Sequence, residues 1–209
     1  MMNKRQGEET SEAERLEQLW RGEFGDAYVD RNAGPDHRGP FWRQLLERYP
    51  IQRVLEVGCN IGGNLQWVVQ KIPARQVFGV DVNEKALRIV RDRLQINANW
   101  STARELPFRD RWFDLVLTSG VLIHQPEETL IEVMSEVVRC SRRYVLCVEY
   151  FSEQTVEVPY RGQTGSLFKR DYGRLYAESF PHLKLLEQGF LGRDEGWDDD
   201  TWWLFEKSR

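Results

Sequence analysis

Cysteine is scarce in these 209 residues, and long apolar runs are missing. The three cysteines, Cys59, Cys140 and Cys147, form no Cys-x-x-Cys pair, which argues against a disulfide framework and against a thiolate zinc site. No run approaches the roughly 20 apolar residues that cross a bilayer. The first ten residues are polar and lack the apolar core of a signal peptide. We therefore expect reduced thiols, no membrane partner and a cytoplasmic location.

A concentrated basic surface is also missing. The formal net charge is −4 at pH 7 and the basic residues are scattered, so nucleic acid is disfavoured as a partner and a small-molecule substrate is favoured. No set of His, Glu and Asp has metal-ligand spacing, so we expect no metal. The acidic run 194–200 lacks the spacing of an EF-hand and is interpreted as a solvated hairpin loop.

The middle of the chain alternates between strand and helix patterns. This alternation at short spacing predicts βαβ units and a mainly parallel sheet in one α/β domain. After it we expect an irregular segment, a helix near 171–179 and an antiparallel pair of strands near 183–190 and 201–206. For the part of the chain before this segment, the patterns predict, in order, helices at 12–20 and 41–49, strand 52–57, helix 63–72, strand 76–81, helix 83–94, strands 96–100 and 113–118, helix 126–139 and strand 144–149.

The most informative stretch joins a buried strand to a Gly-rich turn that opens a helix. The apolar run Val54–Val57 enters Gly58-Cys59-Asn60-Ile61-Gly62-Gly63, and such a turn cradles a nucleotide. Gly58 permits the sharp turn, and Gly62 lets backbone approach a ligand where a Cβ would collide. Asn60 replaces a third glycine, and asparagine is among the non-Gly residues that best tolerate a positive φ.

Asp81 ends the second strand about twenty residues beyond Gly62, which is the ribose position of a nucleotide fold. A carboxylate there can accept hydrogen bonds from both ribose hydroxyls. The same carboxylate would repel a 2′-phosphate, so NADP is disfavoured.

These motifs resemble, as a set, the class I S-adenosylmethionine (SAM) dependent methyltransferases. The resemblance covers about residues 40–150 and implies SAM as cofactor and a Rossmann-like α/β sandwich, with a seven-stranded, mainly parallel sheet and helices on both faces. Thr102 stands where that superfamily usually has Asp, so a hydroxyl would meet the adenine amine. The positions that carry the resemblance are Glu56, Gly58, Asn60, Gly62, Asp81, Thr102-Ala103, Leu106-Pro107-Phe108, Phe113-Asp114, Ser119 and His124.

A second resemblance covers nearly the whole chain and is to the bacterial pseudaminic acid biosynthesis-associated methylases. It implies SAM binding, and the family name points to a surface-sugar pathway, while the acceptor stays open. The segments concerned are Leu19-Trp20, Glu23-Phe24-Gly25-Asp26, Tyr28, Arg31-Asn32, Glu149-Tyr150, Pro159-Tyr160-Arg161-Gly162 and Leu167-Phe168-Lys169-Arg170-Asp171.

These resemblances give an expected organisation. Residues 1–34 form an N-terminal tail and helical lid, and residues 35–209 form the SAM-binding domain with a second lid segment inserted at 151–167. Tyr28 and Arg31 would cover the methionine half of the cofactor. His124 would be a base, because its unperturbed pKa lies near 6.5, or part of the pocket wall. Tyr160 and Arg161 would face the acceptor, and Glu149 ends a strand beside it.

The leading hypothesis is a SAM-dependent methyltransferase that acts on a small metabolite, a sugar or amino-acid derivative, at oxygen or nitrogen. One alternative keeps SAM but closes its own amine onto its carbon chain, as azetidine-2-carboxylate synthases do on this fold, and releases methylthioadenosine. Another alternative is a non-catalytic binding protein that retains the fold. The sequence leaves the oligomeric state open.

Overall fold

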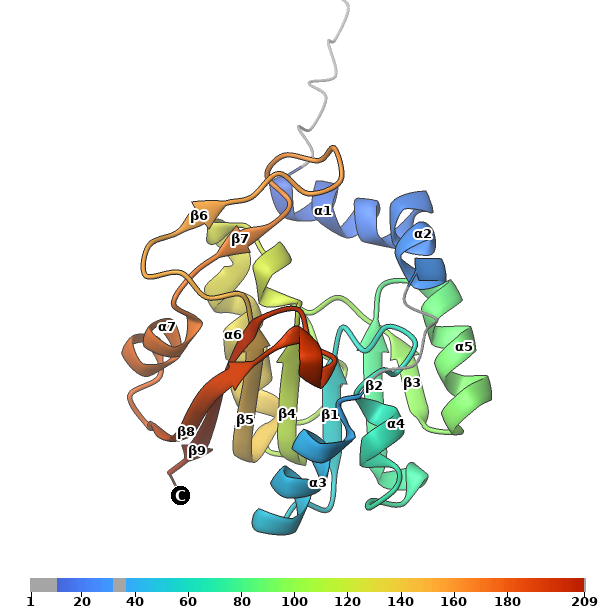
Figure 1. Ribbon diagram of the computed structural model, residues 1–209, viewed down its shortest axis with the longest axis vertical. Helices are drawn as coiled ribbons and strands as arrows, with labels where there is room; N and C mark the ends of the chain where they lie inside the picture. Colours follow the sequence, from blue (N-terminus) through green and yellow to red (C-terminus); the bar gives the residue numbers. More distant parts are fainter. Residues whose placement is uncertain (1–10, 32–36, 209) are drawn as a thin grey trace, which may run out of the picture.

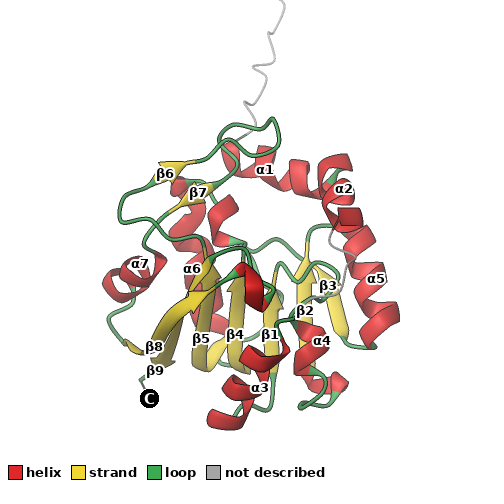
Figure 2. Ribbon diagram, in the orientation of Figure 1, coloured by secondary structure: helices red, strands yellow, loops and turns green. Residues whose placement is uncertain are grey.

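Seven strands form one sheet in the computed structural model, which describes residues 11–31 and 37–208 (Figures 1 and 2). The strand order is β3-β2-β1-β4-β5-β9-β8, in which β1 to β5 are parallel and β9 and β8 are antiparallel to their neighbours. The predicted α/β class and the antiparallel closing pair are therefore confirmed. The strands are β1 (Val54–Val57), β2 (Val77–Asp81), β3 (Asn97–Trp100), β4 (Phe113–Ser119), β5 (Ser141–Glu149), β8 (Leu183–Leu191) and β9 (Asp200–Lys207).

Helices cover both faces of this sheet because its central strands are apolar on both sides. All four residues of β1 are buried, as are the first six of β4, which is the pattern of a parallel strand between two helical layers. One core lies against α3 (Gly39–Arg48), α4 (Leu65–Val68) and α5 (Glu84–Leu94). The other lies against α6 (Glu127–Cys140) and α7 (Tyr172–Ser179). Within the described residues, no helix is long and apolar enough to span a membrane.

Local structure departs from the predictions in two places. The helix predicted at 63–72 is much shorter, since regular helix covers only α4 and turns flank it. The predicted irregular segment 151–167 contains β6 (Val156–Glu157), which pairs with β7 (Phe168–Lys169) as a small hairpin. The boundary expected between residues 34 and 35 lies outside the described residues.

Two segments that are far apart in the sequence form a roof over the carboxyl ends of the parallel strands (Figure 1). One is α1 (Glu12–Arg21) with α2 (Glu23–Arg31), and the other is the β6–β7 hairpin. The Arg15 guanidinium of α1 donates to the carbonyl oxygens of Thr164 and Gly165, at 3.2 and 3.4 Å. Asn83, at the start of α5, donates through Nδ2 to the carbonyl of Trp20 and to the Asp26 carboxylate. The Arg15 bonds therefore join the two roof segments to each other, and Asn83 anchors the helical segment to α5.

Gly62 is required by helix packing. Its φ is +80°, and a Cβ placed there would lie 2.6 Å from Val90 Cγ2 and 2.8 Å from Leu94 Cδ1, both on α5. Gly62→Ala should therefore lower the free energy of unfolding by about 2–4 kcal/mol, because backbone strain and overpacking add. Urea unfolding would measure this loss. Gly162→Ala is the control: its φ is +78° but nothing lies within 4 Å, so it should cost only about 1 kcal/mol. Equal losses in the two variants would contradict the packing role.

Candidate functional site

The main cavity of the described residues lies beneath the roof, at the carboxyl ends of β1, β2 and β4, and has a volume of about 400 Å³. Ligands of open α/β sheets bind at this edge. Ten predicted site residues contribute to its walls: Tyr28, Arg31, Glu56, Gly58, Asn60, Asp81, Thr102, Ala103, Ser119 and His124.

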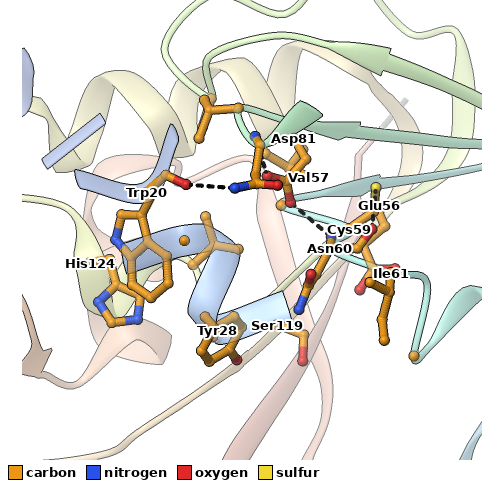
Figure 3. Close-up of a pocket in the computed structure, with 18 of the residues that line it drawn as sticks. Trp20, Tyr28, Glu56, Val57, Cys59, Asn60, Ile61, Asp81, Ser119 and His124 are labelled. Carbon is orange, nitrogen blue, oxygen red and sulfur yellow. Dashed lines mark hydrogen bonds between the residues drawn. The ribbon is translucent and has the colours of Figure 1, made fainter. Parts of the chain in front are cut away.

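Asp81 and the Gly-rich turn form one wall (Figure 3). Asn60 has a φ of +45°, so the predicted left-handed asparagine is present, and its backbone N–H donates to Asp81 Oδ2 at 2.8 Å. The N–H of Asn83 donates to Asp81 Oδ1 at 2.9 Å. Burial raises the pKa of Asp81, while these N–H groups favour its charged form. Since each carboxylate oxygen can accept more than one hydrogen bond, the fixed carboxylate can still accept from a ligand.

A second wall is a polar network that the sequence motifs did not indicate. Asn64 donates through Nδ2 to Glu56 Oε1 at 2.7 Å, and its Oδ1 accepts from Arg38 and from the Trp42 indole. Arg38 also donates through Nε to the carbonyl of Gly196 at 2.9 Å. Glu56, Asn64, Arg38 and Gly196 all line the cavity. This network joins the end of β1 to the loop between β8 and β9.

The predicted hairpin loop at 194–200 connects β8 to β9, and its residues Asp194, Glu195, Asp198 and Asp199 are exposed as expected, but the loop is not solvated throughout. Trp197 is buried and lies under the Arg38 guanidinium, 4.5 Å from its carbon to the ring centroid. Asp200 is buried as well, which raises its pKa to about 6, and Gly196 and Asp198 line the cavity. Charge composition suggested solvent exposure, but the buried tryptophan pulls the loop onto the domain.

His124 ends η2 (Leu122–His124), the short turn that follows β4. Its Nδ1 is hydrogen-bonded to the carbonyl oxygen of Ser166 in the β6–β7 segment. A carbonyl only accepts, so Nδ1 carries the proton and Nε2 keeps the lone pair. Burial lowers the pKa of His124 to about 4, and the Ser166 carbonyl opposes this shift. The imidazole is therefore neutral near pH 7 and is a weaker base than an unperturbed histidine with a pKa near 6.5.

Aromatic rings close the roof above His124. Trp20 packs against His124 with ring centroids 4.5 Å apart, and Figure 3 shows the two side by side at one end of the cavity. Trp20 also meets Tyr28 and Phe24 edge to face, and Tyr160 meets Phe24 and His124. The sequence reading missed Trp20 as a lining residue, although its helical spacing with Phe24 and Tyr28 was a usable signal.

Three predicted site residues lie outside the cavity walls. Gly62 faces α5, as described above. Tyr160 reaches the site only through its ring contacts with His124 and Phe24. Arg161 is exposed in a tight turn with a φ of +48°. Its guanidinium lies over the ring of Tyr160, 5.8 Å from the guanidinium carbon to the ring centroid.

The imidazole of His124 should stay neutral well below its usual range. In ¹H–¹³C NMR spectra its signals should change little between pH 7 and 5.5, and titrate near 4 if the fold survives. Because the unfolded chain binds this proton at a higher pH, the free energy of unfolding should fall as the pH drops from about 6.5 toward 4. His124→Asn assigns the signal and should reduce that fall. A midpoint near 6.5 in the folded protein would show that the pocket is open to solvent.

Comparison with known proteins agrees with this geometry. Residues 54–143 match a family model described as a methyltransferase domain. The chain is 31% identical over 109 residues to Methyltransferase GfsG of Streptomyces halstedii, covering 47% of this chain and 38% of that protein. It therefore spans well under half the length of this curated relative.

Solved structures show the same fold at low identity. The 1,6-didemethyltoxoflavin N1-methyltransferase of Burkholderia thailandensis, with bound 1,6-didemethyltoxoflavin and S-adenosylhomocysteine, has a TM-score of 0.73 at 16% identity, covering 97% of this chain and 93% of its own. The magnesium protoporphyrin IX methyltransferase of Synechocystis, with bound SAM, has a TM-score of 0.70 at 11% identity, covering 97% and 100%. The fold is thus that of class I methyltransferases, and SAM as a cofactor is consistent with these relatives.

Proposed function

We propose that this chain is a SAM-dependent methyltransferase that acts on a small metabolite, a sugar or amino-acid derivative, at oxygen or nitrogen. The observation that carries the proposal is the Asp81 carboxylate, oriented by two backbone N–H groups, beside a left-handed Gly-rich turn in a cavity under an aromatic roof. The match of residues 54–143 to a methyltransferase domain supports it.

The cavity suits SAM in charge and in hydrogen bonding. The side-chain oxygen of Asn60 and the indole N–H of Trp20 are buried without a hydrogen-bond partner among the described residues, so each can pair with a ligand. Asp81 would accept from the ribose hydroxyls, and Thr102 with Ala103 would border the adenine. Glu56, Gly58, Asn60 and Ser119 would border the methionine part, with Tyr28 and Arg31 over it. Aromatic faces of Trp20 and Tyr28 suit a cation.

When bound, SAM supplies a methyl group on a positively charged sulfur. The protein's own contribution is alignment and exclusion of water, which suffice for an in-line transfer to a good nucleophile. His124 is neutral, and its Nε2 lone pair can accept a hydrogen bond from an acceptor. Because the pKa of His124 is about 4, it is a weak base, so positioning is its main role in this proposal.

The weak base and the aromatic wall also favour a second candidate, a SAM cyclase of the azetidine-2-carboxylate synthase type. There the amine nitrogen of SAM forms a bond to its own carbon chain, the carbon–sulfur bond breaks, methylthioadenosine leaves and the nitrogen loses a proton. No external acceptor has to be deprotonated. The folded, desolvated cation would lie against Trp20 and Tyr28.

Incubating the purified protein with SAM alone separates the two candidates. Methylthioadenosine formed without an acceptor identifies the cyclase. Stable SAM that is converted to S-adenosylhomocysteine when a sugar or amino-acid derivative is added identifies the methyltransferase. SAM that binds but is never consumed would leave a non-catalytic binding protein.

Asp81→Ala should weaken S-adenosylhomocysteine binding by about 1.5–3 kcal/mol, because charge-assisted hydrogen bonds to the ribose are lost. Isothermal titration calorimetry would measure the change. Asp92→Ala is the matched control: it removes an exposed carboxylate from α5, outside the cavity, and should leave the affinity unchanged. Unchanged affinity in Asp81→Ala would show that Asp81 does not bind the ribose. Tighter binding of NAD than of S-adenosylhomocysteine would contradict the assignment of SAM as cofactor.

A further inference from the structure

Glu149, the last residue of β5, is fully buried and lies behind the cavity wall. Its Oε1 accepts from the backbone N–H groups of Val121 and Leu122 at 3.2 and 3.1 Å, and its Oε2 accepts from Ile123 at 3.3 Å. One carboxylate thus holds three successive amides of the turn that follows β4. Three bonds to a single rigid group fix the orientation of that turn as well as its position.

The turn held by Glu149 forms the side of the cavity that carries His124. The backbone N–H of His124 donates to the carbonyl of Val121 at 3.0 Å, so His124 is part of the same turn and its imidazole moves with it. On its other side, Val121 packs onto the Gly-rich turn, because a Cβ added to Gly58 would lie only 2.4 Å from Val121 Cγ2. A shift of the turn would therefore displace His124 or push Val121 into the backbone at Gly58.

A carboxylate in this place has an energetic cost that an apolar residue would avoid. Burial raises the pKa of Glu149 to about 8, and the three backbone N–H groups offset part of that shift. Without the carboxylate, however, three buried N–H groups would lose their acceptor. Each buried N–H group without an acceptor lowers the stability of the fold. A glutamine would keep the shape but offer one acceptor oxygen in place of two, and its amide N–H₂ would face a backbone donor.

We propose that Glu149 is a positioning residue, whose carboxylate holds the Val121–Ile123 turn between β5 and Gly58 and so sets the placement of His124 and the shape of the cofactor pocket. The part of this inference that concerns the cofactor rests on the function proposed above. The part that concerns the turn and His124 stands without it.

The test compares Glu149→Gln with Asp114→Asn. Asp114 is also a buried carboxylate, and it accepts hydrogen bonds from the backbone N–H groups of Gln52 and Arg53 at 2.9 and 3.0 Å. It lies at the amino end of β4, outside the main cavity. Both variants should lose stability to urea. Only Glu149→Gln should weaken S-adenosylhomocysteine binding, by about fivefold or more, and shift the ¹H–¹³C signals of His124. Asp114→Asn should stay within about twofold of the wild type.

Equal affinities and unshifted His124 signals in a folded Glu149→Gln protein would overturn the proposal, as would equal effects of the two variants. If Glu149→Gln does not fold, amide exchange in the wild-type protein decides: the N–H groups of Val121, Leu122 and Ile123 should exchange as slowly as those inside β4, and fast exchange would overturn the proposal. If wild-type protein does not bind S-adenosylhomocysteine, the proposed function fails, while the His124 signals and the exchange rates still decide the role of Glu149.

Discussion

The hydrogen bond from the backbone N–H of Asn60 to the Asp81 carboxylate is the constraint on which the site depends. The turn after β1 is also tied to the end of β2 by the N–H groups of Gly58 and Cys59, which both donate to the carbonyl of Val80. These bonds require left-handed backbone at Gly58 and Asn60, with φ of +71° and +45°. The wall formed by Asp81 and the Gly-rich turn is therefore in place without a ligand, because backbone hydrogen bonds hold the turn to the end of β2.

The roof is held mainly by side-chain contacts. They include the Arg15 bonds to two carbonyls, the Asn83 anchor, the ion pair of Glu17 with Arg104, the rings around Trp20 and the packing of buried Val29 with Ile61 and Ala86. In the proposed function, this roof would keep water away from the transferred methyl group.

The two ionisable groups His124 and Glu149 are suited to hold parts of the site in position. The His124 imidazole is neutral because it is buried, and the Glu149 carboxylate is occupied by backbone amides behind the wall. His124 is therefore a weak base, and both carboxylate oxygens of Glu149 already accept hydrogen bonds from the backbone. Both candidate reactions fit this arrangement, because each depends on aligning a nucleophile with the activated carbon more than on proton transfer.

The sequence by itself determined the α/β class, the succession of strands and helices along the chain, and the positions of Gly58, Asn60 and Asp81, because these follow from apolar strand runs and from backbone conformations that few residues adopt. It also assigned His124 to the segment after β4. Only the tertiary structure decided the environment of His124, the burial of Trp197 and Asp200 in the 194–200 loop, the network of Arg38 with Asn64, and the exposure of Arg161. Each of these depends on contacts between segments far apart in the chain, such as Ser166 with His124 and Arg38 with Gly196. Local patterns of charge and spacing do not encode which distant surface a side chain meets, and that meeting sets its burial and its pKa.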